Sequence, residues 1–430
     1  MTSTSAERPR CPFPIDLIDA DTFARGVPFN DFATMRHESP VFWHDQPGLS
    51  GNGFWVVTRH ADVVAVSRTP EVFSSWERGA MLPVLRENSP DEDAGLPAAR
   101  LLMLNMDGAE HRDYRNIVQR AFAPRIIRSL EARLEELADR IVDQALAKGE
   151  GDFVKDIASE LPLLAICELV GVPPEDRELI FELSNRMLGA DDPDVASSPD
   201  DGPLAMAEMF AFADRIAAER RDCPMDDVAT KLLQAEVDGT ALTQEQFDVF
   251  FLLLMVAGNE TTRNSISHGM KAFFDHPEQW EHFKRNRPDV LDTAVEEIIR
   301  WATPVLQFQR TALADHVLGE QLIRAGDRVA IYYASANRDE NAVTAPDVFD
   351  ITRRDNDHIA FGGGGPHFCL GANLARAEVR IMFNAIANRI PDITPLGEPR
   401  YLRSMFVSGI KELPVRYRPN ASPSRCRPRH

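Results

Sequence analysis

The sequence predicts a mostly α-helical fold with small β-sheets, formed by a single domain of 430 residues. First, apolar residues recur at helical spacing through three long segments, 126–188, 247–268 and 289–301. Second, strand-like runs are short, as in 53–58 and 328–333. Third, no internal repeat and no long Gly/Ser or charged linker divides the chain, so we expect one domain.

Composition and charge narrow the class of protein. Hydrophobic residues are 44% and charged residues 27% of the chain, values typical of a soluble globular protein. The formal net charge of −20 disfavours nucleic acid as a partner, and an anionic membrane surface would repel such a chain. We therefore expect neither partner.

From the N-terminal residues we expect no signal peptide. The first residues lack the apolar core of a signal peptide, and no stretch approaches the ~20 apolar residues of a membrane span. We expect a cytoplasmic protein without a membrane anchor, with flexible ends over about residues 1–12 and 419–430. The five cysteines are scattered without a CxxC pair, so neither a disulfide framework nor a zinc site is expected.

The first third of the chain mixes short elements. The run 53–58 predicts a strand, 60–67 a short helix, and 70–99 an irregular region rich in Gly, Pro and Asp. A long irregular loop in a compact domain is usually functional or disordered, and we expect a lid that faces the substrate. A helix follows over 107–124, and on it His111 and Arg115 share one face. That pair alone also fits a solvated basic surface.

The middle of the chain is helical, with breaks at 149–152 and 172–174 and a flexible loop over 189–203. Thr243 and Gln246 form a capping box that opens a long helix, apolar on nearly all sides and therefore central and buried.

This helix contains Gly258-Asn-Glu-Thr-Thr262. A glycine inside a helix lowers its stability, and a buried carboxylate is costly to desolvate, so both residues require an explanation. Oxygen activation would supply one. Gly258 would leave room for dioxygen, the Thr261 hydroxyl would donate to it, and Glu260 would relay protons from solvent. A kinked helix, with Thr261 bonded to its own backbone and Glu260 in a salt bridge, is the structural alternative.

Two further patterns follow. Glu297 and Arg300 are three residues apart on the helix over 289–301, where such pairs are ordinarily exposed and contribute only ~0.2–0.5 kcal/mol. Arg310 precedes the strand at 328–333 and, by itself, is an ordinary strand-end charge.

The most informative stretch is Phe361-Gly-Gly-Gly-Gly-Pro-His-Phe-Cys369, followed by a helix. The free N–H groups and dipole of a helix N-terminus favour a thiolate, which acts as a nucleophile or as a metal ligand. Four glycines would let the loop lie close to something flat, such as a haem face. An ordinary turn with a core cysteine explains the same residues about equally well.

This stretch resembles the cysteine loop of the cytochrome P450 superfamily, in which the cysteine is the proximal ligand of haem iron. The match rests on Phe361, Gly365, His367, Cys369 and Gly371. Phe361 lies eight residues before Cys369 instead of the usual seven, as in the bacterial subgroup that hydroxylates sterols and methyl-branched lipids. The family's other motifs occur in the expected order across residues 100–415.

The resemblance implies a role for each motif. The residues implied to bind the haem propionates are His111, Arg115, Arg310 and His367. The residues that match the family's distal helix are Ala257, Gly258, Glu260 and Thr261. The residues implied to brace the proximal side are Glu297, Arg300, Phe349 and Arg353. The residues that would line the substrate pocket are Val256, Val305, Leu306, Phe308, Met405 and Phe406, although apolar stripes of this kind are usually core.

The resemblance also implies the fold and the chemistry. We expect the P450 triangular prism, haem b as cofactor, and hydroxylation of an unactivated C–H bond with O2. Electrons would come from a ferredoxin and its NAD(P)H-dependent ferredoxin reductase, and we expect a monomer. A locally basic proximal surface, with Arg120 and Arg376 as candidates, would receive the acidic partner.

The implied substrate is a hydrophobic sterol, methyl-branched lipid or terpenoid. A hydroxylase or epoxidase that tailors a macrolide or another secondary metabolite is the alternative. A peroxide-driven hydroxylase and a haem-thiolate sensor are further alternatives, but both would lack the need for Glu260 and Thr261.

Overall fold

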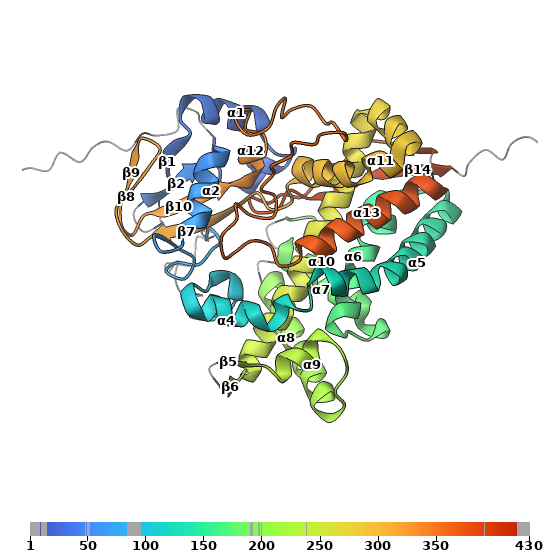
Figure 1. Ribbon diagram of the computed structural model, residues 1–430, viewed down its shortest axis with the longest axis horizontal. Coiled ribbons are helices and arrows are strands. Elements are labelled where there is room, and N and C mark those ends of the chain that lie inside the picture. The colour runs from blue at the N-terminus through green and yellow to red at the C-terminus, as the bar shows by residue number, and fades with distance from the viewer. Residues whose placement is uncertain are drawn as a thin grey trace, which may run out of the picture.

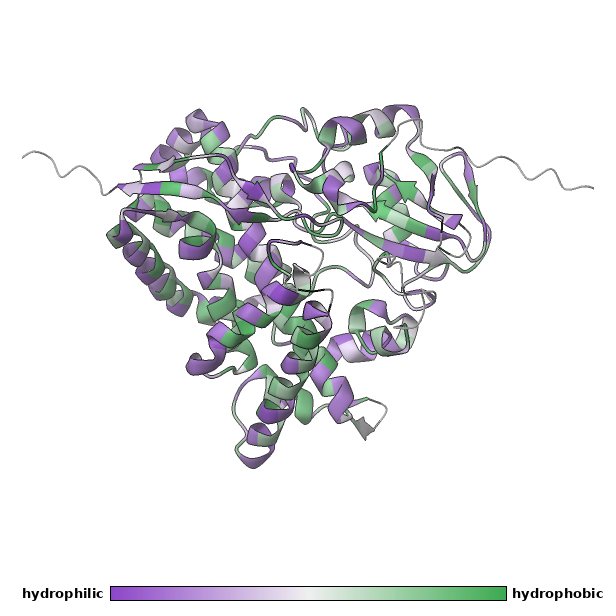
Figure 2. Ribbon diagram, turned by 180° about the vertical axis from the view of Figure 1, so that it is seen from behind, coloured by the Kyte–Doolittle hydropathy of each residue, from purple (hydrophilic) through white to green (hydrophobic). Residues whose placement is uncertain are grey.

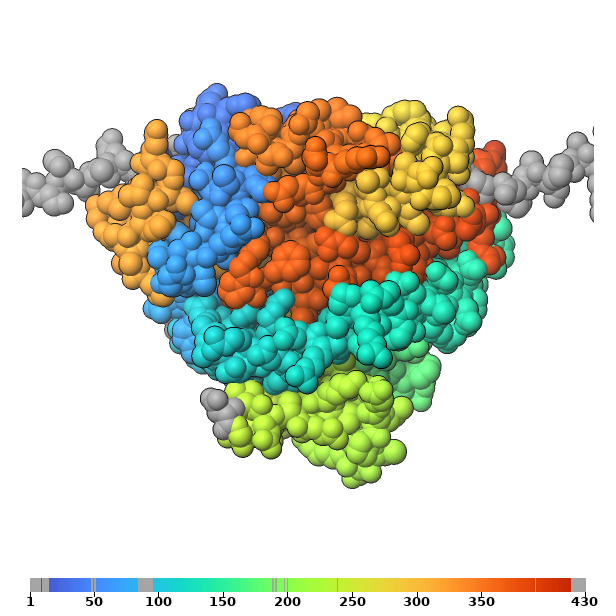
Figure 3. Space-filling view, in the orientation of Figure 1, coloured from blue at the N-terminus to red at the C-terminus, as the bar shows by residue number. Residues whose placement is uncertain are grey.

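A strand-rich region and a larger helical region lie side by side and give the molecule a triangular outline (Figures 1 and 3). This computed structural model describes residues 9, 15–47, 49, 52–83, 96–189, 192–196, 198, 200–237, 239–390 and 392–418. The expected flexible ends therefore lie almost entirely outside the described residues, as does much of the expected lid over 70–99. That the chain forms one domain stays a prediction.

The strand-rich region is built on a five-stranded sheet with the order β1-β2-β10-β7-β3. Its neighbours pair antiparallel except β10 and β2, which pair parallel. Both predicted strands belong to this sheet. Its strands are β1 (Val41–Asp45), β2 (Gly53–Val57), β3 (Phe73–Ser74), β7 (Gln307–Ala312) and β10 (Arg328–Tyr332).

Smaller sheets accompany it. β4 lies inside the predicted break at 149–152 and pairs with β14, near the other end of the chain. The remaining strands are β4 (Glu150–Asp152), β5 (Glu236–Val237), β6 (Thr240–Ala241), β8 (His316–Leu318), β9 (Gln321–Ile323), β11 (Asp392–Pro395), β12 (Arg400–Tyr401), β13 (Ile410–Glu412) and β14 (Pro414–Arg418).

Helices form the rest of the described fold and end where the sequence predicts breaks. The helices before and after the 149–152 break stop at Gly149 (φ 76°) and Gly171 (φ 98°), because glycine adopts positive φ without strain. The helices are α1 (Phe29–Glu38), α2 (His60–Arg68), α3 (Leu96–Ala99), α4 (Gly108–Gln119), α5 (Pro124–Lys148), α6 (Glu160–Val170), α7 (Arg177–Leu188), α8 (Asp201–Asp222), α9 (Val228–Leu233), α10 (Gln244–Asp275), α11 (Pro277–Ala302), α12 (Tyr333–Ala336) and α13 (Ala372–Arg389).

The predicted central helix is α10. Its capping box is confirmed, since the Thr243 side chain accepts from the Gln246 N–H and the Gln246 side chain accepts from the Thr243 N–H. α11 begins at Pro277, well before the predicted start at residue 289. The backbone leaves helical geometry at Asn286 (φ −117°), and this kink places Pro288 in the first turn of the second half, where proline is tolerated.

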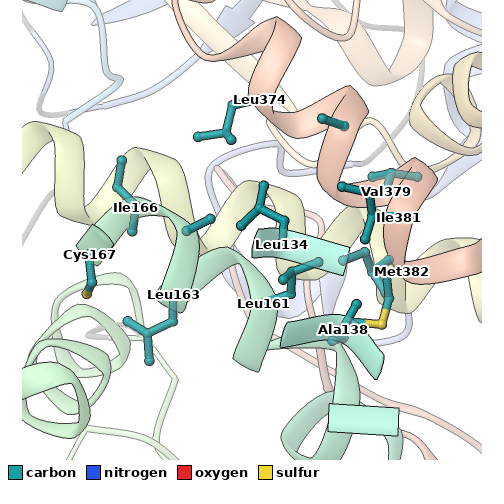
Figure 4. Close-up of a cluster of buried hydrophobic side chains, with 14 of the residues drawn as sticks. Leu134, Ala138, Leu161, Leu163, Ile166, Cys167, Leu374, Val379, Ile381 and Met382 are labelled. Atoms are coloured by element: carbon teal, nitrogen blue, oxygen red, sulfur yellow. The ribbon is translucent and has the colours of Figure 1, made fainter. Parts of the chain in front are cut away.

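The main hydrophobic core lies between α5, α6, α10 and α13. Figure 4 shows side chains of α5, α6 and α13 directed into one cluster, among them Leu134, Leu161, Ile166 and Met382. The helix ribbons alternate between hydrophobic and hydrophilic segments, as amphipathic helices do (Figure 2). Within the described part of the chain, no helix has the length and apolarity that crossing a membrane requires.

Candidate active site

The cysteine loop is closed by a backbone hydrogen bond of 2.8 Å from the Cys369 N–H to the Phe361 carbonyl. Three of its four glycines are explained by α2. A Cβ at Gly363 would lie 2.6 Å from Ser67 Oγ, and one at Gly365 (φ 73°) would lie 2.3 Å from the Ser67 carbonyl oxygen. Gly364 likewise faces the Arg68 side chain, at 2.7 Å from its Nε. These three glycines let the loop pack on α2, and a close approach of the loop to a flat ligand stays a prediction.

Cys369 stands just before α13, whose N-cap is Gly371. Its side chain has exposed surface, yet protein surrounds it, so the sulfur faces an internal space. Burial raises the pKa of the thiol, while the backbone N–H groups of Gly371 and Ala372 and the nearby Arg115 act in the opposite direction. A bound metal cation would add to this opposing effect and favour the thiolate.

Four cationic or ionisable side chains from α4, β7 and the cysteine loop gather near this sulfur. The rings of His111 and His367 lie 4.2 Å apart, and Arg115 Nη2 donates to the Phe368 carbonyl at 2.6 Å. Arg310 is only 5% exposed and donates to the Gln309 carbonyl at 2.7 Å. Burial, with His367 and Arg115 nearby, lowers the pKa of His111 to about 3.

The positive charges of this cluster would be stabilised by a bound anion. Burial lowers the pKa of the Arg310 guanidinium, and within the described residues no carboxylate forms an ion pair with Arg310 or Arg115. A buried guanidinium without a counterion is unfavourable, and its planar fork matches a carboxylate. The four residues that the sequence pointed to are thus brought together, and they suit the two propionates of a haem.

Asp107 belongs to this cluster but was missed by the sequence analysis. Its carboxylate accepts from Ser74 Oγ at 2.5 Å, from the Ser75 N–H at 3.0 Å and from the Trp76 N–H at 3.2 Å. Burial alone would raise its pKa, but these hydrogen bonds and one with His367 lower it to about 2. At the N-cap of α4 an aspartate predicts a helix cap, whereas this one fastens the 74–76 loop beside His367.

On the distal side, one face of the otherwise buried α10 has accessible surface. Ala257 is exposed and Thr261 is partly exposed, while Asn259 and Glu260 are buried. The Thr261 hydroxyl donates to the Ala257 carbonyl at 2.9 Å, and Glu260 pairs with Arg263. The Thr261 backbone bond and the Glu260 ion pair of the structural alternative are therefore present, whereas α10 has no recorded kink along its described length. Donation from Thr261 to dioxygen, which needs rotation of its side chain, stays a prediction.

Gly258 lies against α6. A Cβ at this position would lie 2.9 Å from Cγ1 and 3.0 Å from Cδ1 of Ile166 in α6. The close packing of α6 on α10 is enough to account for the missing side chain, and room for dioxygen beside Gly258 stays a prediction.

The proximal brace, which we define as Glu297, Arg300 and Arg353, is buried and complete. Arg300 donates through Nε and Nη2 to the two oxygens of Glu297, each at 2.8 Å, and Arg353 Nε donates at 3.1 Å. Both Glu297 and Arg300 are 0% exposed. Phe349 packs edge-on against the rings of Phe273 and Trp301. All four residues implied to brace the proximal side thus come together.

The expected pocket residues divide into two groups. The two segments that carry them meet, because the Leu306 N–H donates to the Phe406 carbonyl at 2.9 Å and the rings of Phe308 and Phe406 lie 5.4 Å apart. The residues with accessible surface are Val256, Val305, Phe308 and Phe406. Leu306 (0% exposed) and Met405 (6%) are corrected to core, since they pack in a cluster with Phe32, Phe42 and Phe54.

The two arginines expected on the proximal surface also differ. Arg120 is exposed at the end of α4. Arg376 of α13 is partly exposed, donates to Glu296 at 2.6 and 3.0 Å and lies over the ring of Phe361, so its charge is paired within the chain.

The residues present fit a haem. Cys369 offers a single sulfur at a helix N-terminus, the kind of ligand that a haem iron takes from a protein. Cys369 would supply the thiolate, and the accessible face of α10 would form the distal side. Arg115 and Arg310, which have no ion pair within the described residues, would bind the propionates.

Comparisons with known proteins agree with this geometry. The Cytochrome P450 family matches residues 204–389. The chain is 47% identical to a steroid C26-monooxygenase of Rhodococcus jostii, over 96% of this chain and 87% of the relative. It is 41% identical to a methyl-branched lipid omega-hydroxylase of Mycobacterium tuberculosis, over 89% of this chain and 90% of the relative.

Solved structures give the same result. A Mycobacterium marinum cytochrome P450 in complex with pseudoionone is 41% identical and superposes with a TM-score of 0.88, over 96% of this chain and 100% of the other. A Bacillus megaterium cytochrome P450 in complex with testosterone is 30% identical, with a TM-score of 0.80 over 92% and 98%. The chain therefore belongs to the cytochrome P450 family and is a haem-dependent monooxygenase.

Proposed function

We propose that this monooxygenase hydroxylates the terminal carbon of a methyl-branched alkyl chain, carried by a sterol or a branched lipid. One observation supports this most. The two similar relatives are named for oxidation at steroid C26 and at the omega position of a methyl-branched lipid, and both names denote the end of a chain. The partly accessible residues Val305, Phe308 and Phe406 would offer such a chain an apolar wall.

The reaction balances as R–H, O2, two electrons and two protons giving R–OH and water. Haem, when bound, supplies the activation of dioxygen. The chain's own residues would do the rest: Cys369 would give its thiolate to the iron, and Arg115 and Arg310 would bind the propionates. Glu260 would take protons from water and pass them on by way of the Thr261 hydroxyl.

The two electrons would come from a ferredoxin that docks over α13. This face carries a groove of about 370 Å³ between α5, α11 and α13. Its lining combines the apolar residues Ile127, Val295 and Ala377 with charged residues of both signs, namely Arg128, Glu131, Asp292, Glu296, Arg376 and Arg380. Figure 3 shows α13 flanked by α11 and α5 on this face. Arg125 and Arg128 are exposed beside it and, like Arg120, have no ion pair within the described residues. These three arginines would attract an acidic partner despite the net charge of −20.

The test has two parts. The reduced protein should give the carbon monoxide difference spectrum of a haem thiolate, and Cys369→Ser should lose it. Cholesterol, incubated with the protein, a bacterial ferredoxin, its reductase and NADPH, should gain one oxygen atom, located by mass spectrometry at the end of the side chain.

Two results would contradict the proposal. Oxygen inserted into the sterol rings would place the reacting carbon elsewhere, and turnover of a macrolide but of no branched chain would favour the tailoring alternative. That alternative has some support, since a cytochrome P450 in complex with erythromycin B is 31% identical with a TM-score of 0.78.

A further inference from the structure

An ion pair inside α10 joins the expected proton relay to a neighbouring helix. Arg263 Nη2 donates to Glu260 Oε2, one helical turn away, and the two residues are 8% and 1% exposed. Arg263 Nη1 donates to Asn185 Oδ1 of α7 at 2.7 Å. A single guanidinium therefore contacts both the acid of α10 and a polar side chain of α7.

The same place holds buried polar atoms that lack a partner. They are Glu260 Oε1, Arg263 Nε and both amide atoms of Asn259, within the part of the chain that the structure describes. Buried polar atoms in proteins nearly always have a hydrogen-bond partner, and water is the usual one where side chains supply none. The free oxygen of Glu260 is therefore the atom that can exchange protons with water.

The charge of Glu260 depends on Arg263. Burial raises the pKa of the Glu260 carboxyl, and Arg263 opposes this most. The Asn264 amide, which lies nearby, acts in the same direction as Arg263, although neither its Nδ2 nor Glu260 Oε1 has a partner that meets hydrogen-bond geometry within the described residues. A carboxyl under two opposing effects can both accept and release a proton, as a relay requires. A purely structural ion pair would instead have both oxygens bonded, as Glu297 has.

We propose that Arg263 is a positioning residue for hydroxylation: it holds Glu260 beside Thr261 and, through Asn185, makes that placement depend on the position of α7. The proposal rests on the proposed relay role of Glu260. Because Asn185 stands on α7, a displacement of α7 would move Arg263 and disturb the relay. Proton delivery would then depend on α7 keeping its present place beside α10.

The test compares five variants of the haem-loaded protein: Glu260→Gln, Arg263→Gln, Arg263→Lys, Asn185→Ala and Arg215→Gln. Arg215→Gln is the matched control, because Arg215 of α8 pairs with Asp176 at 3.0 Å, just before α7, and with Glu219 at 3.4 Å, and neither partner belongs to α10. With cholesterol as probe, one measures product formed per NADPH, hydrogen peroxide released and the solvent deuterium isotope effect. Arg263→Lys and Asn185→Ala keep a cation beside Glu260, so they test the proposal even if Arg263→Gln fails to fold.

Glu260→Gln should lower the rate of product formation by about 10²-fold. Product per NADPH should fall most in Arg263→Gln, less in Asn185→Ala and least in Arg263→Lys. The larger the fall, the larger the solvent isotope effect should be. Arg215→Gln should behave as wild type. If Glu260→Gln keeps full yield, the relay role itself is wrong. If Glu260→Gln loses yield but Arg263→Gln does not, Arg263 is merely structural, and an unaffected Asn185→Ala refutes the link to α7.

A readout independent of turnover is the infrared band of the protonated Glu260 carboxyl, identified by its absence in Glu260→Gln. Removing Arg263 takes away the charged group that faces this carboxyl, so the midpoint pH of the band should rise in Arg263→Gln and change little in Arg263→Lys. An unchanged midpoint in Arg263→Gln would overturn the positioning role.

Discussion

Two buried Glu–Arg pairs with the same spacing lie on opposite sides of the haem site and differ in how completely they are bonded. In the proximal brace, Glu297 accepts from Arg300, Arg353, the Asp350 N–H and Asn356, at 2.8 to 3.1 Å. In the distal pair, Glu260 has one oxygen bonded to Arg263 and one without a partner within the described residues.

This difference distinguishes an ion pair that stabilises the fold from one that can take part in proton transfer. A buried charge is stable when all its hydrogen-bonding capacity is used, so the brace can only hold its surroundings in place. A partly bonded carboxylate costs stability and persists where it serves another purpose. Sequence spacing alone cannot distinguish them, because both pairs are three residues apart on a helix.

The largest effect should come from breaking the brace. Glu297→Gln would leave Arg300 and Arg353 buried without their counterion, so the free energy of unfolding should fall by about 3–5 kcal/mol. Urea unfolding followed by circular dichroism measures this. Glu281→Gln, which breaks an exposed pair of the same spacing with Lys284 on the same helix, should cost less than about 1 kcal/mol. Equal losses in the two variants would mean that the brace is not structural.

The next largest effect on the free energy of unfolding should come from the buried carboxyl of Glu378. Glu378 of α13 is 0% exposed, and burial raises its pKa to about 8, although the Thr262 hydroxyl of α10 acts against this. In the unfolded chain the same group ionises near pH 4. Between these values the folded state binds more protons than the unfolded state, so stability falls as pH rises.

Glu378→Gln should remove this pH dependence. Between pH 5 and pH 8 the unfolding free energy of wild type should fall more than that of the variant, by on the order of 3 kcal/mol. Urea unfolding at several pH values gives both curves. Parallel curves for the two proteins would show that Glu378 is ionised in the folded state.

Much of the fold could be predicted because its signals are local. The capping box of α10 and the glycines that end α5 and α6 act within a few residues of their own position. The start of α11 could not, since Pro288 looks like a helix break until the kink at Asn286 places it in a first turn.

Residues of the site could be predicted with their contacts only where a family motif also specifies the residue or group that they contact. Gly258, Gly363 and Gly365 were identified, but the residues that they pack against, Ile166 of α6 and Ser67 of α2, are distant in sequence. The burial of Leu306 and Met405 depends in the same way on a cluster built by the N-terminal segment. Neither Asp107 nor Arg263 stood out, because an acid at a helix start and a charge on a helix are common in any sequence.

The smallest expected loss of stability concerns two asparagines, one on each side of the haem site, and each is 0% exposed. On the proximal side Asn337 donates to Thr303 Oγ1 at 2.8 Å and accepts from the Ile359 N–H at 2.7 Å. On the distal side neither amide atom of Asn259 has a partner within the described residues. Asn337→Ala should therefore lower the free energy of unfolding by about 1–3 kcal/mol, because it leaves its partners unpaired.

Asn259→Ala should cost less than about 1 kcal/mol, since no protein hydrogen bond is lost, alanine favours the helix and water can fill the space. Urea unfolding of both variants measures the contrast. A loss for Asn259→Ala as large as that for Asn337→Ala would mean that ordered water bonds Asn259 as firmly as protein bonds Asn337. The distal side would then be as completely bonded as the brace, and the contrast between the two sides would be one of partner and not of completeness.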